Sequence, residues 1–170
     1  AAIRSGKRHI TEPFFIIQDK EFLAQFPQVE KIYASMYSVN GIVRNAYMEK
    51  AERYIRFHGA ATFAEGGAFQ DIPYIIKKYG IVPEEAYRGL NYGTELPDFT
   101  GLTPALEGFV KALANGKVLT PNWKDALNAL LDSYFGPMPE TFTYQGKEYT
   151  PKSYAASLGL NYDDYIEIGS

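Results

Sequence analysis

The chain has 170 residues, enough for one domain whose folding can bury about 70% of the surface that the unfolded chain exposes. Its net charge is −3 and no stretch approaches the ~18 apolar residues of a bilayer span, so we expect neither a nucleic-acid surface nor a membrane span. The sequence holds no cysteine and two histidines, which excludes a thiolate nucleophile, disulfides and cysteine-bound metals, and predicts no cofactor. The cellular compartment stays open.

The N-terminal segment, residues 1–33, is marked by one apolar tetrapeptide. Phe14–Ile17 is too short for the core of a signal peptide and predicts a buried strand. A short helix is predicted to follow and to end at Pro27, and a second one is predicted over Val29–Tyr37.

Two longer helices are predicted in the next part of the chain. The first runs from Asn40 to His58 and is ended by Gly59. The second runs from about Ala68 to Tyr79 and is ended by Gly80, and a fixed turn follows at Val82–Glu85. The predicted inward-facing residues are Val43, Tyr47, Lys50, Ala51 and Tyr54 on the first helix, and Ile72, Ile75, Ile76 and Tyr79 on the second.

The C-terminal half contains the same dipeptide, a threonine followed by a proline, three times. Thr103, Thr120 and Thr150 are each predicted to cap a helix with a proline at its first position, and the three helices are predicted to end at glycines. These helix-ending glycines are Gly116, Gly136 and Gly159. The predicted buried residues are Leu106, Phe109, Val110, Leu113, Trp123, Leu127, Leu130, Leu131, Tyr134, Tyr154, Ala155 and Leu158.

Between the last two of these helices, Gln145-Gly146 separates two short β-prone runs, Phe142–Tyr144 and Lys147–Tyr149. This arrangement predicts a two-residue β-hairpin. The sequence therefore predicts a single, mainly α domain over residues 1–170, with a minor β component in the form of one small hairpin.

The charged clusters are better explained by structure than by chemistry. Asp163, Asp164 and Glu167 have a spacing that could hold a hard cation, but no EF-hand pattern accompanies them, so no metal site is predicted. A catalytic triad would have to recruit His9 or His58. The predicted place of His58 at a helix end gives its imidazole a structural role beside the last carbonyl groups. Helix-start charges are the interpretation of Glu65, Glu84 and Glu85.

The informative stretch is Glu65-Gly66-Gly67-Ala68-Phe69-Gln70-Asp71. Paired glycines just before a helix let another backbone approach closely and expose amides at the positive end of the helix, a place suited to an extended peptide. On local physics alone, a tight loop–helix junction without a ligand is the better explanation of the pair. No lysine–hydroxyl pair follows the glycines, so they do not form a phosphate-binding loop.

This stretch, together with its surroundings, resembles the papain-like cysteine peptidases, in particular the bacterial aminopeptidase C and bleomycin hydrolase branch. The resemblance covers residues 35–95 closely and 103–168 loosely, and residues 1–33 have no counterpart in it. It divides the chain into an unmatched N-terminal segment, a papain-like helical core over 35–95 and a helical insertion with the hairpin over 96–170. The segments that carry the resemblance are Ser35–Tyr37, Lys50–Gly59, Glu65–Tyr87, Tyr87–Gly93 and Tyr144–Pro151.

The resemblance implies the helical half of a papain-like fold and peptide-binding roles for Gly66, Gly67, Ala68 and Phe69. In the family, the backbone of the glycine pair holds an extended substrate, and the next two positions flank a substrate side-chain pocket. The family's cysteine would fall between Thr11 and Phe15, where this sequence has none. Its histidine and asparagine belong to a β-rich second half that the sequence is not expected to contain. No catalytic residue is therefore assigned.

Two functional hypotheses follow. The first is an inactive or incomplete relative of a cysteine aminopeptidase that keeps a peptide-binding face, whether as a natural pseudoenzyme, a fragment or an engineered version. The second is a structural or protein-interaction module built on the helical half of the fold. In either case the face that normally meets the second half needs a cover. Residues 1–33, self-association or a partner that supplies the missing half could provide it.

Overall fold

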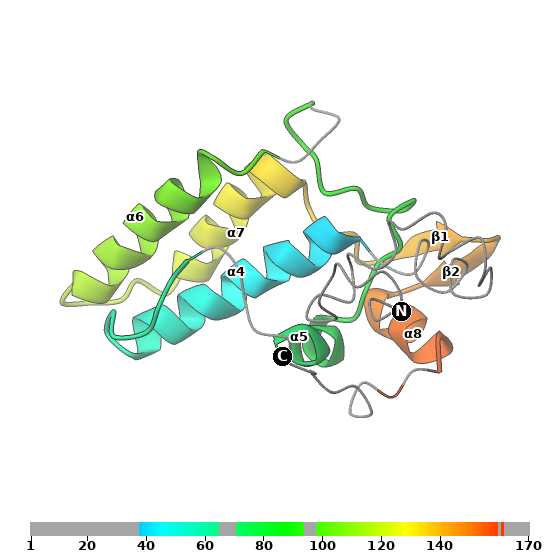
Figure 1. Ribbon diagram of the computed structural model, residues 1–170, viewed down its shortest axis with the longest axis horizontal. Helices are drawn as coiled ribbons and strands as arrows, with labels where there is room; N and C mark the ends of the chain where they lie inside the picture. Colours follow the sequence, from blue (N-terminus) through cyan, green and yellow to red (C-terminus); the bar gives the residue numbers. More distant parts are fainter. Residues whose placement is uncertain (1–37, 65–70, 94–97, 160, 162–170) are drawn as a thin grey trace, which may run out of the picture. The chain divides into compact units, whose positions relative to one another are not determined.

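The computed structural model describes residues 38–64, 71–93, 98–159 and 161. Within these ranges the chain forms five helices and one two-stranded antiparallel sheet (Figure 1), which confirms the prediction of a mainly α chain with one small hairpin. The described residues before 40, between 71 and 87 and after 138 form unit 1, and those over 40–64 and 88–138 form unit 2. The predicted strand and helices before residue 38 lie outside the described residues.

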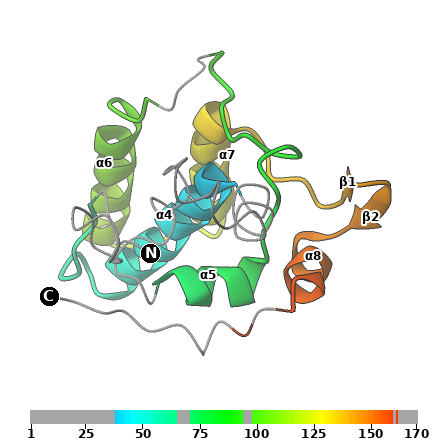
Figure 2. The ribbon, with the colours of Figure 1, turned by 45° about the vertical axis from the view of Figure 1, so that its right-hand side comes forward.

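Unit 2 is built on three helices, α4 (Val39–Arg56), α6 (Leu102–Asn115) and α7 (Trp123–Phe135). Helices α6 and α7 lie side by side in both ribbon views (Figures 1 and 2). Each buries a row of apolar side chains spaced four residues apart, the spacing that keeps a helix face turned to one neighbour. These fully buried residues are Leu102, Leu106 and Val110 on α6, and Leu127, Leu131 and Phe135 on α7.

The predicted inward faces of these helices point to the correct side, but they include more residues than the structure buries. Phe109, Leu113, Leu130 and Tyr134 are half-buried because they flank the line of contact. Phe135 was not predicted to be buried, yet it is 1% exposed and its ring lies 4.9 Å from that of Phe99.

Helix α4 confirms the helix predicted from Asn40 to His58, and its end shows why the helix stops there. His58 and Gly59 have positive φ angles of 49° and 81°, and the Gly59 N–H donates to the Tyr54 carbonyl. Positive φ reverses the chain out of the helix, a conformation that glycine adopts without strain. The inward face is centred on Tyr47 and Ala51, as predicted, whereas Val43 and Tyr54 are half-buried.

Two polar residues, Arg44 and Asn45, are buried on α4, and neither was predicted to face inward. Arg44 is 7% exposed, and its Nε donates to Asp132 Oδ1 of α7 at 3.1 Å. Its Nη2 forms an ion pair with the same carboxylate and donates to Asn128 Oδ1 at 3.2 Å. A second tie links α4 to α6, since the Tyr47 hydroxyl lies 2.8 Å from Thr103 Oγ1. Unit 2 is therefore joined by specific polar contacts as well as by apolar packing.

Unit 1 contains α5 (Asp71–Tyr79), the hairpin strands β1 (Phe142–Tyr144) and β2 (Lys147–Tyr149), and α8 (Pro151–Ser157). The hairpin is the one predicted: Phe142 pairs with Tyr149, and both turn residues, Gln145 and Gly146, have positive φ, as a two-residue turn requires. Tyr154 of α8 is 3% exposed and packs edge-on against three rings of the hairpin. These rings belong to Phe142, Tyr144 and Tyr149.

The C-terminal end of α5 packs directly on the first turn of α8. Gly80 ends α5 with φ of 79°, and a Cβ at this position would lie 2.5 Å from the Lys152 amide nitrogen and closer still to the Pro151 carbonyl group. The Ile81 N–H donates to the Pro151 carbonyl at 3.1 Å. One residue further on, the Val82 carbonyl accepts from the Ser38 N–H at 2.6 Å. Gly80 is thus required both for its φ angle and for the close approach of two backbones.

Only one of the three Thr-Pro pairs caps a helix as predicted. Thr150 caps α8, with Pro151 at the first helical position and reciprocal hydrogen bonds between Thr150 and Ser153. The prediction is wrong for Thr103, which lies inside α6 because Gly101 occupies the cap position, so its hydroxyl meets Tyr47 instead. It is also wrong for Thr120, because a further turn, in which the Thr120 carbonyl accepts from the Trp123 N–H, precedes α7.

The predicted glycine exits hold at all three helices. Gly116 and Gly136 are the C-caps of α6 and α7, and Gly159 follows α8 with a φ of 66°. Among the helices of the described ranges, none is both long and apolar enough to cross a bilayer.

Candidate functional site

The four residues predicted to bind peptide, Gly66, Gly67, Ala68 and Phe69, lie outside the described residues. The structure describes the chain on both sides of them, up to Ala64 and again from Asp71. The two flanks belong to different units, so each is described by itself.

On the upstream flank, the chain is anchored to α4 just before the glycine pair. Phe63 is 6% exposed, and its ring centroid lies 6.1 Å from each of the rings of Tyr47 and Tyr54. Lys50 Nζ donates to the Ala64 carbonyl at 2.9 Å. A buried aromatic ring and a charge-assisted hydrogen bond on consecutive residues fix the path of the backbone here.

The sequence predicted the correct helix face for Lys50 but no partner for its ammonium group. It was predicted to lie on the inward face of its helix beside Ala51. A lysine at the margin of an apolar face commonly runs its methylene stem along that face and brings the ammonium to a polar partner, which here is a backbone carbonyl. The ammonium also lies 5.5 Å from the Tyr47 ring centroid.

On the downstream flank, helix α5 begins at Asp71. Its carboxylate in the first turn suits the positive end of the helix, and Pro73, the third helical residue, removes an N–H that has no partner within the helix. Ile75 and Ile76 are the buried pair, as predicted, while Ile72 and Tyr79 are half-buried.

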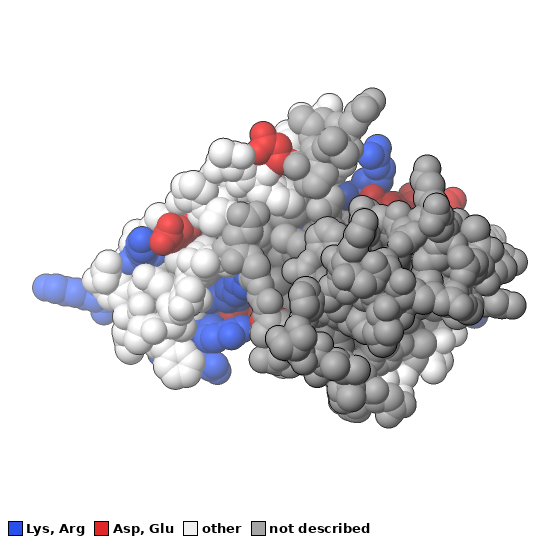
Figure 3. Space-filling model, viewed as in Figure 1, with Lys and Arg blue, Asp and Glu red and all other residues white. Residues whose placement is uncertain are grey.

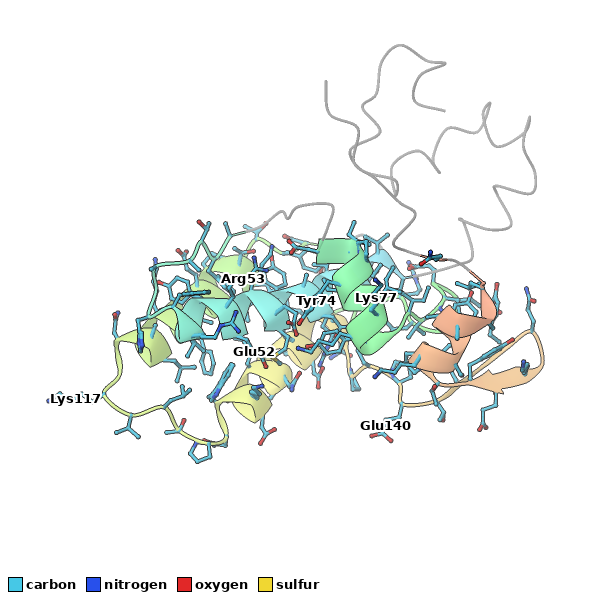
Figure 4. All side chains as sticks on the ribbon, turned by 90° about the horizontal axis from the view of Figure 1, so that it is seen from below. Glu52, Arg53, Tyr74, Lys77, Lys117 and Glu140 are labelled. Atoms are coloured by element: carbon cyan, nitrogen blue, oxygen red, sulfur yellow. The ribbon has the colours of Figure 1, made fainter. Side chains whose placement is uncertain are left out.

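The outer face of α5 combines tyrosine and lysine. Tyr74 is 51% exposed, and Tyr74 and Lys77 both project from the helix (Figure 4). Lys78 Nζ lies 5.8 Å from the Tyr74 ring centroid and 5.3 Å from that of Tyr79, within cation–π range. Over the described part of the surface in Figure 3, acidic and basic side chains are interspersed.

The described ranges contain no group of acidic residues and histidines that could hold a metal ion. In those ranges, no three His, Asp or Glu side chains gather as metal ligands would, and Asp163, Asp164 and Glu167 lie outside them. Of the two histidines, His9 is not described and His58 is exposed at the end of α4.

Two exposed pairs have shifted pKa values for local reasons. The pKa of Asp98 is lowered by the Thr100 hydroxyl and then by the Thr100 N–H, which donates to Asp98 Oδ1 at 3.0 Å. The pKa of Lys111 is raised by its hydrogen bond to Glu107, one helical turn away, at 2.8 Å. Both are contacts between near neighbours in sequence, typical of a turn and of a helix surface.

Comparison with known proteins gives one clear relationship. No curated protein matches the chain significantly. The model of the Peptidase C1-like family matches residues 7–98, more than half of the chain. The match begins well before the resemblance noted over 35–95 and includes most of residues 1–33, so the expectation that this N-terminal segment has no counterpart is wrong from residue 7 onward. It contains the glycine pair, α4 and α5, and ends before α6. The chain belongs to the Peptidase C1-like family of papain-like proteins.

Proposed function

We propose that this chain is a relative of the aminopeptidase C and bleomycin hydrolase branch that binds extended peptides and does not hydrolyse them by itself. One observation carries the proposal: the family model matches residues 7–98, which include the place where the resemblance implies a nucleophile, and the sequence contains no cysteine. Without a thiolate, the acyl-enzyme that opens the family's reaction has no nucleophile to form it.

The anchored flanks of the glycine pair support peptide binding. Phe63 and Lys50 fix the chain up to Ala64, and α5 fixes it again from Asp71. An extended peptide is bound largely through main-chain hydrogen bonds, which need a backbone held in place and free of bulky side chains. The sequence supplies two adjacent glycines between these flanks, a stretch without side chains.

The test is a titration of the isotope-labelled chain, followed by NMR at the Gly66, Gly67 and Ala68 amides. The probes are the tetrapeptide Ala-Phe-Ala-Ala and its N-acetylated form. We expect saturable shifts confined to these amides and their neighbours, and tighter binding of the peptide with the free amino group if the aminopeptidase branch is right. Equal binding of both peptides would remove the aminopeptidase assignment and keep peptide binding.

A variant pair separates binding from general effects. Gly67→Val places a side chain in the proposed binding backbone and is expected to abolish the shifts. Gly108→Ala is the matched control, since a Cβ at this exposed position of α6 meets no atom within 4 Å. Peptide shifts that survive in Gly67→Val would contradict the assignment of the site. Hydrolysis of an aminoacyl anilide by the purified chain would contradict the proposed lack of activity.

An interaction module is the second candidate, favoured by one surface feature. Val118 and Leu119, in the loop between α6 and α7, are 81% and 42% exposed, and the neighbouring Lys117 projects from the same loop (Figure 4). Adjacent apolar side chains at this exposure are typical of a contact surface. Sedimentation velocity of the wild type and of Val118→Asp tests this role: association that the variant abolishes supports it, and a monomer at all concentrations refutes self-association.

A further inference from the structure

Three helix ends meet at one end of unit 2. Lys124, at the start of α7, forms an ion pair with Glu52, near the end of α4. Helix α6 begins where Thr103 lies beside Tyr47 in the middle of α4, and it leads into α7 through the loop 116–122. The C-terminal ends of α4 and α6 and the N-terminal end of α7 therefore lie together, on the left in Figure 1.

Large apolar side chains are exposed at this end, and we call them the apolar tip. Val118 and Leu119, in the loop between α6 and α7, are 81% and 42% exposed, and Phe57, directly after α4, is 52% exposed. Every residue from 115 to 122 is exposed, and Lys117 points away from the helices in Figure 4, so this loop projects from the unit. Three such side chains at one end of a helical unit are typical of a contact surface.

The charged residues around the apolar tip are mainly basic. The segments that form this end, 53–64 and 108–124, contain no aspartate and no glutamate. Three acidic residues lie at their borders: Glu52 pairs with Lys124, Glu107 pairs with Lys111, and Asp125 begins the next stretch of α7. The basic residues of the two segments are Arg53, Arg56, Lys111, Lys117 and Lys124. This end therefore carries more positive than negative charge, in a chain whose net charge is −3.

We propose that this end of unit 2 binds peripherally to a lipid bilayer with anionic headgroups. The apolar tip enters the boundary between headgroups and acyl chains, and the basic residues lie against the lipid phosphates. Lys117 is the central contact, because it directly precedes Val118 and has no ion-pair partner among the described residues. Its methylene stem can follow the apolar tip while its ammonium group meets a phosphate. None of these residues takes part in the proposed peptide site.

Charge and shape both favour a bilayer over a protein partner. A second copy of this end would bring the same basic residues face to face, which their like charges oppose. An acidic protein would match the charge, but it would need a pocket for each apolar side chain of a projecting loop. A bilayer offers anionic headgroups and an apolar layer at one deformable surface.

Flotation of the full chain with vesicles tests the charge requirement. The vesicles are phosphatidylcholine alone and an equal mixture of phosphatidylcholine and phosphatidylserine. We expect binding to the mixed vesicles only, weakened by added salt because salt screens charges at the membrane surface. Lys117→Ala should weaken binding roughly fivefold, the contribution of one basic residue near an anionic surface. Lys147→Ala is the matched control, since it removes the same charge from an exposed residue of β2 in unit 1.

Insertion of the apolar tip has a separate readout. The sequence contains no cysteine, so Val118→Cys provides a single site for an environment-sensitive fluorophore. Its emission should shift to shorter wavelength with the mixed vesicles. The same fluorophore on Ala105→Cys, an exposed position nearer the other end of α6, should show no shift. Val118→Ser combined with Leu119→Ser should weaken binding roughly tenfold or more, because it removes the apolar contact of the loop.

Several results would overturn the proposal. The first is a chain that fails to float with the mixed vesicles at low salt. Equal weakening by Lys117→Ala and Lys147→Ala would show attraction to the chain as a whole, and unshifted emission at Val118→Cys would show adsorption without insertion. If vesicles are not bound, a titration with polyglutamate and sedimentation of the chain alone assign this end to an acidic polypeptide or to a second copy.

Discussion

The close approach at Gly80 predicts that two glycines with the same φ angle tolerate alanine very differently. Gly80 and Gly93 both have φ of 79°. A Cβ at Gly93 meets no atom within 4 Å, whereas a Cβ at Gly80 collides with the peptide group that joins Pro151 to Lys152. Gly93→Ala is therefore a matched control for backbone strain, and the difference between the two variants isolates the collision.

The magnitudes follow from these two contributions. An alanine in the left-handed region costs about 1–2 kcal/mol, and this cost is common to both variants. At Gly80 the start of α8 must also move, which adds about 1–3 kcal/mol for overpacking and weakens the bond from Ile81 to Pro151. We expect a loss of about 2–5 kcal/mol for Gly80→Ala and about 1–2 kcal/mol for Gly93→Ala.

Urea unfolding measures both effects. Far-UV circular dichroism follows all helices, and the single tryptophan, Trp123, reports on α7 in unit 2. The loss in Gly80→Ala should be seen in the circular dichroism transition at an unchanged slope. Equal destabilisation by the two variants would refute the reasoning, because the contact of α5 with α8 would then carry no steric constraint.

Three further predictions concern single contacts. Arg44→Met should destabilise the chain by about 2–3 kcal/mol in urea unfolding, less than for a fully buried pair because the Asp132 side chain is 33% exposed, and Asp132→Leu in the same chain should restore most of the loss. Asp98, whose pKa is lowered, should contribute stability above its ordinary pKa and lose it as the pH falls through the lowered value. Removing the first cause of that shift with Thr100→Val should move the NMR titration of the Asp98 carboxyl upward, and an unmoved titration would contradict the assignment. Gln145→Asn should raise the free energy of unfolding by about 0.5 kcal/mol, since asparagine adopts the positive φ of this turn position more readily than glutamine does. Thermal unfolding should show a slightly higher midpoint temperature.

Local signals in the sequence predicted the helices and the hairpin because those signals act over a few residues. Gly59, Gly80 and Gly136 end helices where their positive φ was needed, and the turn at Gln145-Gly146 sets the hairpin register. The Thr-Pro pairs show the limit of such signals. Thr150 caps its helix, but Thr103 lies inside α6, where its hydroxyl forms a hydrogen bond with Tyr47, 56 residues earlier in the sequence.

Contacts between distant segments could not be predicted from one sequence. The carboxylate of Asp132 holds Arg44 across 88 residues, and no spacing rule links the two positions. The same holds for Gly80, which was predicted to end a helix but not to contact the backbone of another segment. The candidate site depended on the family resemblance, since the glycine pair alone is better explained by a loop that binds no ligand.

The division of the chain between the two units also fixes the order in which they can be completed during synthesis. Unit 2 takes its described residues from positions up to 138, so it can close before the hairpin and α8 have been made. The packing of α5 on α8 comes later, because the peptide group that contacts Gly80 is synthesised about 70 residues after it, which takes about 4–14 s at typical rates of translation. We expect the apolar side of α5, with Ile75 and Ile76, to be a binding site for chaperones on the nascent chain until residue 157 has left the ribosome. Force profiling of arrested chains should accordingly show two separate folding events, the later one tied to the emergence of α8.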